Sequence, residues 1–387
     1  MTRASKTSAF QLALASCEPA SPERNRRIAR LAKLPCLDWR HLLGVARHHR
    51  VEPLVHSTLT EAGIHPPEPV RTMLQDRVRA ATAHSLILSA ESVRLQHLLL
   101  QAGVRSLLLK GGAIGALAYG DRQLKCSWDV DLLVDPENLF TAAALLKDAG
   151  YRRRGGGPDL TAAEMQSELA HEKEILLERA VDALVVELHW RLHNNPFLLG
   201  DWTPATLPAR EVAVPGGSVL TLGDEQHYVY LAVHGASHAW FRLKWLADYC
   251  WWLASKDEQQ VVRLHDAAVR AGAGRCSAQG LLLAHRMLGL DLPLRLRRKL
   301  ERQPIARLLV KLAEKAIASR GGDVALEDKR LLARAILASQ LLLSSAPGYR
   351  RAAFAERWKG IGSPERAGER VSALRRFPLA FWRLVRG

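Results

Sequence analysis

The sequence predicts an α+β fold in which a small mixed β-sheet lies between N- and C-terminal helical regions. Residues 1–103 carry apolar side chains at helical spacing, residues 104–200 alternate strand-like and helix-like stretches, and helical spacing returns from about 224 to 345. At 387 residues the chain is long enough for two or three domains. We therefore expect an N-terminal helical region (1–103), a sheet-containing core (104–200), a C-terminal helical domain (201–345) and a basic tail (346–387).

The N-terminal region is expected to contain several helices separated by proline- and glycine-containing breaks near 19–22 and 63–69. Its apolar runs lie at 12–15, 28–34, 42–46, 54–59 and 86–100. Gly103 is suited to cap the last of these helices. Residues 104–109 (Val-Arg-Ser-Leu-Leu-Leu) follow and predict the first strand.

The core is expected to continue with a glycine turn and helix from residue 111, a strand at 129–134, and a helix from Pro136 to about 148 that Gly150 ends. The stretch 152–158 predicts a loop. Residues 174–178 and 184–190 predict a β-hairpin around 180–182. On its second arm Val185, Glu187 and His189 share one face.

Charge and cysteine content limit the class of protein. The net charge of +16 suits anionic partners such as nucleotides, RNA or an acidic membrane surface, although an arginine-rich coding bias would produce the same value. The tail from 346 counts ten Lys/Arg against three Glu, and is either a solvated tail without a partner or a contact for an anionic surface. Five scattered cysteines without a C-x-x-C pair favour a reducing cytoplasm, and no stretch is long and apolar enough to span a bilayer.

Two carboxylates and a glycine turn are the most informative features. Asp129 and Asp131 are two residues apart on a predicted strand, so both side chains point the same way and can hold one divalent cation. The Gly111-Gly112 turn opens a helix whose free N–H groups suit a phosphate. Together they predict nucleotide chemistry at a two-metal carboxylate site. A third carboxylate must come from a neighbouring strand; Glu187 is the best candidate and Glu174 the alternative.

These motifs resemble the polymerase-β-like nucleotidyltransferase superfamily. The match is carried by Lys110-Gly-Gly112, Tyr119, the segment 125–134 (Lys-Cys-Ser-Trp-Asp-Val-Asp-Leu-Leu-Val) and Gly150-Tyr151. More narrowly, the chain is similar to a bacterial family of uncharacterised nucleotidyltransferases, related to nucleotidyltransferase-type abortive-infection toxins. The similarity spans about residues 40–250 and includes 49–54 and the helical stretch 234–248.

The resemblance implies transfer of a nucleoside monophosphate from an NTP, with Mg²⁺ or Mn²⁺, to an unassigned acceptor such as a peptide, a saccharide, a small molecule or RNA. It implies that Asp129, Asp131 and Glu187 are the catalytic metal ligands, although relatives carry Asp where this chain has Glu187. The residues expected to contact the nucleotide are Lys110, Gly111, Gly112, Lys125, Ser127 and Lys244. Relatives usually carry Arg at the position of Lys125, so its bidentate contact is lost.

Several alternatives stay open from the sequence. The departures at Glu187 and Lys125 also fit a catalytically silent nucleotide-binding regulatory module, and an Asp-x-Asp pair also occurs in metal-dependent glycosyltransferases. His234 and His238, four residues apart on one helical face, suit packing, the lining of a nucleotide pocket, or a zinc site that lacks an obvious third ligand. His189 is placed to orient Glu187.

Overall fold

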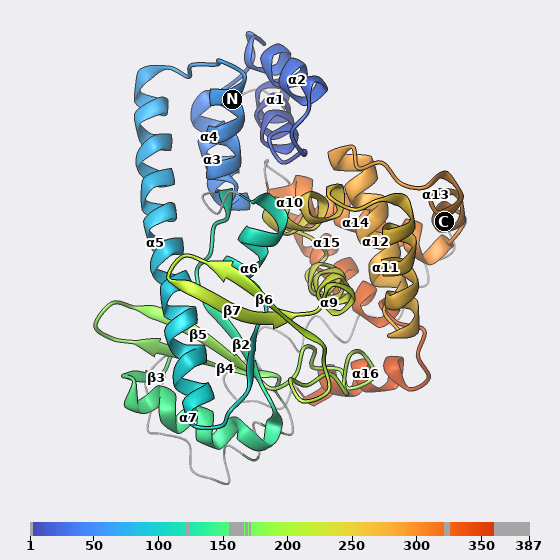
Figure 1. Ribbon diagram of the computed structural model, residues 1–387. Helices are drawn as coiled ribbons and strands as arrows, with labels where there is room; N and C mark the ends of the chain where they lie inside the picture. The colour runs from blue at the N-terminus through green and yellow to red at the C-terminus, as the bar shows by residue number, and fades with distance from the viewer. Residues whose placement is uncertain are drawn as a thin grey trace.

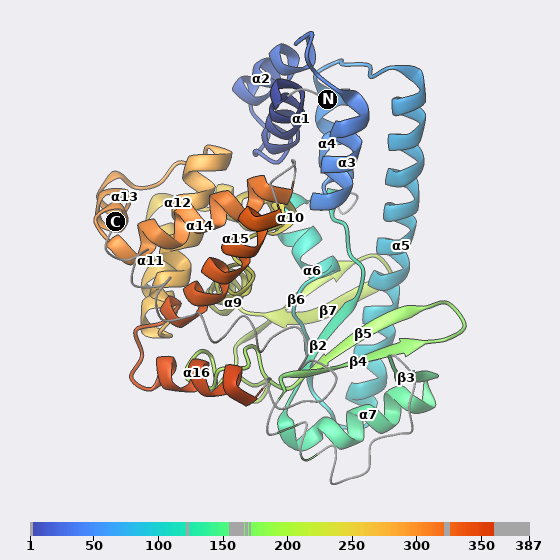
Figure 2. The ribbon, with the colours of Figure 1, turned by 180° about the vertical axis from the view of Figure 1, so that it is seen from behind.

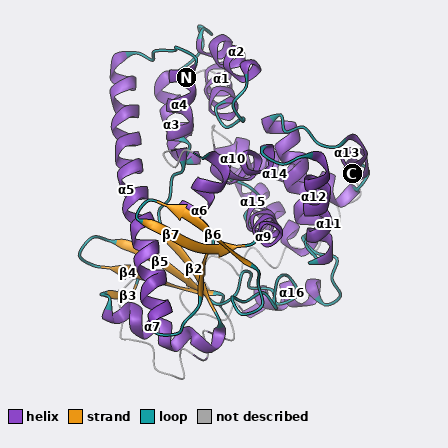
Figure 3. Ribbon diagram, viewed as in Figure 1, coloured by secondary structure: helices purple, strands orange, loops and turns teal. Residues whose placement is uncertain are grey.

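The computed structural model describes residues 3–120, 124–154, 166, 169, 172–320 and 326–359. A single seven-stranded mixed sheet lies among helices from both ends of the chain (Figures 1 and 3), and the predicted α+β class is confirmed. The predicted loop at 152–158 is wrong at residues 152 and 153, which belong to a strand, and from residue 155 it lies outside the described residues, as does the basic tail beyond residue 359.

Five helices precede the sheet, and each contains an apolar run that the sequence predicts. They are α1 (Arg3–Ala15), α2 (Pro22–Ala32), α3 (Trp39–His49), α4 (Glu52–Glu61) and α5 (Glu68–Gln101). Ser21 and Asp38 cap α2 and α3 by accepting backbone N–H bonds, as such side chains do at helix starts. The 34-residue α5 runs from these helices along the whole sheet (Figure 1), so it connects the N-terminal region to the core.

The sheet has the strand order β3-β4-β5-β2-β1-β7-β6. Its strands are β1 (Ser106–Leu108), β2 (Val130–Val134), β3 (Tyr151–Arg153), β4 (Glu174–Arg179), β5 (Leu184–His189), β6 (Ala209–Val214) and β7 (Gly217–Leu222). The predicted hairpin is confirmed as the antiparallel pair β4–β5, and β5 pairs in parallel with β2.

Three strands were not predicted. The edge strand β3 pairs with β4 through only three residues, too few for a strand pattern to be recognised in the sequence. The hairpin β6–β7 lies within the stretch expected to belong to the C-terminal helical domain, yet β7 pairs in parallel with β1 and extends the sheet. Gly216 and Gly217, with φ of 96° and 147°, form the turn between these two strands.

The two faces of the sheet are covered by different parts of the chain. Leu108, Leu132, Val186 and Leu188 pack with α5 and α7 (Leu139–Asp148), which follows the short 3₁₀ turn η3 (Pro136–Asn138). Leu107, Leu109 and Leu133 point to the opposite face and join the larger apolar core of the C-terminal helices. The carboxylates of β2 and β5 therefore project toward those helices, because they alternate with the α5-facing residues.

The C-terminal helices form the second large part of the molecule (Figure 2). They are α9 (Asp224–Ser237), α10 (Leu243–Ala254), α11 (Glu258–Arg270), α12 (Gly274–Leu288), α13 (Leu294–Glu301), α14 (Pro304–Arg320), α15 (Leu326–Ser339), the 3₁₀ turn η4 (Gln340–Leu342) and α16 (Tyr349–Lys359). Among the described helices, none combines the length and the apolar character that crossing a membrane requires.

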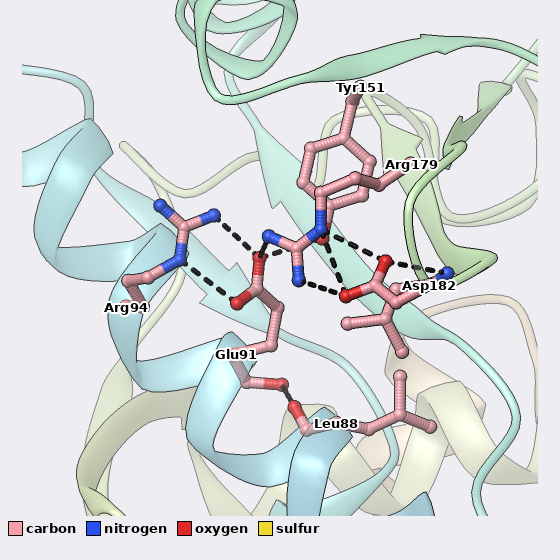
Figure 4. Close-up of polar contacts among 8 residues, drawn as sticks. Leu88, Glu91, Arg94, Tyr151, Arg179 and Asp182 are labelled. Carbon is pink, nitrogen blue, oxygen red and sulfur yellow. Dashed lines mark hydrogen bonds and ion pairs between the residues drawn. The ribbon is translucent and has the colours of Figure 1, made fainter.

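A polar network fastens α5 to the hairpin side of the sheet (Figure 4). Glu91 Oε1 accepts hydrogen bonds from Tyr151 Oη at 2.7 Å and from Arg179 Nη1 at 2.9 Å, and Arg94 binds the same carboxylate through two nitrogens. Arg179 also binds Asp182 in the β4–β5 turn. The network fixes the register of α5 against β3 and β4, on the face of the sheet away from the carboxylates of β2.

Candidate active site

The register of β2 with β5 brings two of the predicted carboxylates together. Asp131 is directly opposite Glu187 in this parallel pair, and both side chains point to the face covered by the C-terminal helices. Asp131 is 1% exposed. Lys110 Nζ lies 2.5 Å from Asp131 Oδ1 and 3.9 Å from Glu187 Oε2. The end of β1, where Lys110 lies, therefore contributes a cation between the two carboxylates.

His189, two residues after Glu187, completes the cluster. Its Nε2 lies 3.4 Å from both Asp131 Oδ1 and Glu187 Oε2, and its Nδ1 lies 3.0 Å from Glu174 Oε2. Burial and the charge of Lys173 lower the pKa of His189, but the three carboxylates outweigh them and raise it to about 9. Glu174, the alternative third carboxylate of the sequence analysis, thus contacts the far side of the imidazole and orients the ring against Glu187.

Asp129 lies just before β2 and next to this cluster. Burial and the negative charge of Asp131 raise its pKa, while Lys110, Lys244 and Arg50 lower it. Within the described residues, the tight group of potential metal ligands consists of Asp131, Glu187 and His189. Asp129 borders that group, and the negative charge of Asp131 acts on it.

The cluster fits a divalent cation. Both carboxylate oxygens of Asp131 are buried and accept no hydrogen bond of acceptable geometry, although Lys110 Nζ is close to one of them. Lys110 supplies one positive charge to this carboxylate, and its oxygens remain able to bind a cation. Carboxylate oxygens are the ligands that Mg²⁺ prefers, so Asp131 and Glu187 are suited to hold it, and Asp129 borders them.

The glycine turn lies beside the start of the carboxylate strand. Gly111 has φ 62° and ψ −130°, a conformation that other residues avoid, and a Cβ there would meet Ser127 Oγ at 3.8 Å and the Asp129 carbonyl oxygen at 4.0 Å. Gly112 begins α6 (Gly112–Ile114), which continues as the π-helical turn η1 (Gly115–Tyr119). A Cβ on Gly112 would lie 2.7 Å from Ser89 Oγ of α5. The turn therefore brings bare backbone against Ser127 and Asp129.

Lys125 has a different environment from the one expected of a phosphate ligand. Its ammonium pairs with Asp248 of α10, and both side chains are 7% exposed. Tyr119 Oη donates to the other oxygen of Asp248 at 2.8 Å. Lys125 thus ties the glycine-turn segment to the helical domain, and Asp248 is a site-supporting residue that the sequence analysis did not identify.

Two further cations reach Asp129 from distant parts of the chain. Burial, followed by the charge of Lys125, lowers the pKa of Lys244 to about 7, against the opposing effect of Asp129. Arg50, at the left-handed end of α3, places its guanidinium 5.0 Å from the centre of the half-exposed Trp128 ring. Arg50 was missed as a site residue, and its only signal was its position in the family-like stretch 49–54.

His234 and His238 lie across from the carboxylates, in an aromatic group formed by α9 and the start of α10. Their rings are 4.9 Å apart, and they are 5.3 and 5.0 Å from the ring of Trp245. The charge of Lys110 acts on both histidines. Neither belongs to a cluster of three potential metal ligands in the part of the chain that the structure describes, so the zinc alternative receives no support.

Comparison with known families agrees with this geometry. A family model described as an uncharacterised nucleotidyltransferase matches residues 35–289. The chain belongs to this family. The matched range runs from the loop before α3 to the end of α12, so it includes Arg50 and Lys244 as well as the sheet. No curated protein and no solved structure matches the chain.

Proposed function

We propose that this chain is a metal-dependent nucleotidyltransferase that moves a nucleoside monophosphate from an NTP to a hydroxyl acceptor and releases pyrophosphate. The observation that carries the proposal is the register of Asp131 with Glu187 beside the Gly111 turn. Carboxylates that hold cations next to backbone N–H groups of a helix start suit displacement at a phosphorus. The family assignment supports the same reaction class.

Asp129, Asp131 and Glu187 would hold Mg²⁺ or Mn²⁺. When bound, such ions stabilise the charge that develops on the phosphate oxygens and favour the ionised form of the attacking hydroxyl. His189 keeps the Glu187 carboxylate oriented toward Asp131, and Glu174 holds the opposite nitrogen of that imidazole. Lys110 supplies positive charge to the same oxygens.

The triphosphate would lie along the glycine turn. Gly111 and Gly112 offer backbone N–H groups, Ser127 offers a hydroxyl, and Lys110 and Lys244 offer ammonium groups whose charges act on Asp129. We assign Lys125 to positioning, because its ammonium is paired with Asp248. NTP is thus the expected partner, and the acceptor class (peptide, saccharide, small molecule or RNA) is left to experiment.

The test is a pyrophosphate-release and label-transfer assay with the four α-labelled NTPs, Mg²⁺ or Mn²⁺, and a cell extract as the acceptor pool. The variants are Asp131→Asn and Glu187→Gln, with Glu178→Gln of the same hairpin as the matched control. We expect transfer to be lost in the first two and kept in the control. Equal transfer by folded Asp131→Asn would refute the proposal.

Two other outcomes would assign the protein differently. NTP binding without any transfer by the wild type would favour the nucleotide-binding regulatory module. Hydrolysis of a nucleotide-sugar with transfer of its sugar would favour a glycosyltransferase.

The five cysteines are all free, which supports a reducing cytoplasm as the proposed location.

A further inference from the structure

We propose that His234, His238, Phe241 and Trp245 form the stacking surface for the nucleobase of the NTP. We call these four residues the ring wall. The inference rests on the proposed function, because it takes the carboxylates of β2 and β5 as the place of the α-phosphate. It adds a base-binding site contributed by α9 and α10, outside the strands that carry the catalytic carboxylates.

The ring wall is continuous and begins opposite the catalytic cluster. Its contacts run from His234 to His238 and Trp245, and from Trp245 to Phe241 at 4.9 Å. On the inner side, the ring of His234 is 5.9 Å from that of buried Tyr230, whose hydroxyl is under the influence of Lys110, Asp131 and Glu187. On the outer side His238 is exposed. Flat rings therefore extend from the carboxylates to solvent.

The stereochemistry of displacement directs the nucleoside to this side. In an in-line reaction the attacking and leaving oxygens occupy opposite ends, and the other three oxygens of the α-phosphate surround the phosphorus. The carboxylates project from the sheet, so non-bridging oxygens of a phosphate bound there would face them. The remaining oxygen carries the ribose and points away from the sheet. In that direction lie α9 and α10.

The approach of the triphosphate is consistent with this direction. Lys244 directly precedes Trp245 on α10, and its ammonium lies close enough to Asp129 for the two charges to interact. A nucleotide with its phosphates between the glycine turn and Lys244 would lie against the start of α10, the helix that also carries Trp245. Trp128 is a large exposed aromatic near the site, whereas Trp245 is half-buried, but Trp128 alternates with Asp129 and faces His84 of α5.

The ring wall is rigid and holds one unused polar atom. Ala239 and Trp240, with φ of 47° and 52°, form a strained corner between α9 and α10, and the Trp240 ring packs against Gly235 where a Cβ would lie 2.4 Å away. His234 Nε2 is buried and has no hydrogen-bond partner. Burial and the charge of Lys110 lower the pKa of His234 and keep that ring neutral. A neutral ring suits stacking.

The experiment measures binding rather than turnover. Calorimetry of the full chain with Mg²⁺ compares the α,β-methylene analogues of the four NTPs with inorganic tripolyphosphate. The variants are Trp245→Ala and His238→Ala, with Trp245→Phe as the conservative replacement and Trp128→Ala as the control. Loss of a stacked base weakens binding by about fivefold to hundredfold. We expect that loss for the analogues in Trp245→Ala, a smaller one in His238→Ala, near-complete retention in Trp245→Phe, and unchanged tripolyphosphate binding throughout.

Three outcomes would overturn the inference. Unchanged analogue binding in Trp245→Ala and His238→Ala would show that the ring wall does not hold the base. An equal loss for analogues and tripolyphosphate would show that these residues act on the phosphates or on the fold. Loss of analogue binding in Trp128→Ala alone would move the base to the α5 side. Failure of the wild type to bind either ligand would instead refute the proposed function.

Discussion

Gly111→Ala is the sharpest test of the glycine turn. Gly111 has φ 62° and ψ −130°, and a Cβ there meets nothing closer than Ser127 Oγ at 3.8 Å. The substitution therefore introduces backbone strain without a collision. Such strain costs about 1–3 kcal/mol, and the smaller entropy of the unfolded alanine chain offsets about 0.4–1 kcal/mol of it. We expect a net destabilisation of about 1–2 kcal/mol.

The functional effect should exceed the effect on stability. The variant relieves its strain by shifting the peptide groups at the start of α6, the groups that the triphosphate would contact, so tripolyphosphate affinity and pyrophosphate release should both fall. Urea unfolding and calorimetry measure the two effects. Gly103→Ala is the matched control, because Gly103 also has a positive φ, 75°, and no atom near its Cβ position, but it ends α5 away from the carboxylates. If Gly111→Ala unfolds like the wild type, or if Gly103→Ala loses the same affinity, the reasoning about the turn is wrong.

Three further predictions concern the polar contacts. Glu91→Gln should destabilise the fold by about 1.5–3 kcal/mol, because it weakens the hydrogen bonds to charged Arg94 and Arg179. Although burial raises the pKa of Glu91, its hydrogen bonds from Arg94 and Tyr151 hold that pKa below the ordinary value of 4.5. The stability difference from wild type is therefore full above that pH and should shrink as the pH falls below it, and a pH-independent difference would contradict this. Lys125→Met should lower the free energy of unfolding by about 3–5 kcal/mol, because it leaves Asp248 buried without its cation. Combining it with Asp248→Leu should recover part of that stability in thermal unfolding. A double variant less stable than Lys125→Met would count against the pairing. Because the pKa of Lys244 is lowered to about 7, its ammonium loses its charge as the pH rises through that value, and tripolyphosphate should bind more weakly. Lys244→Arg should remove the part of this pH dependence that the ligand's own titration does not explain. The same pH profile of binding in both proteins would exclude a role for Lys244.

The sequence by itself determined the local geometry of the site. A strand places every second side chain on one face, so the spacing of Asp129 and Asp131, and of Glu187 and His189, was enough to predict shared faces. The alternation on 184–190 also identified Glu187 as an inward carboxylate, and the structure pairs it directly with Asp131. The two glycines at 111 and 112 likewise predicted the turn, because few residues other than glycine adopt the conformation seen at residue 111.

Only the tertiary structure decided which distant groups meet those carboxylates. Arg50 and Lys244 are far apart in the chain, yet both act on Asp129, and Asp248 takes the ammonium of Lys125 that the sequence analysis assigned to phosphate. The addition of β6 and β7 to the sheet was equally hidden. The reason is physical: short-range spacing is set by the period of a strand or helix, whereas contacts between distant segments are set by how their apolar faces pack together around one sheet.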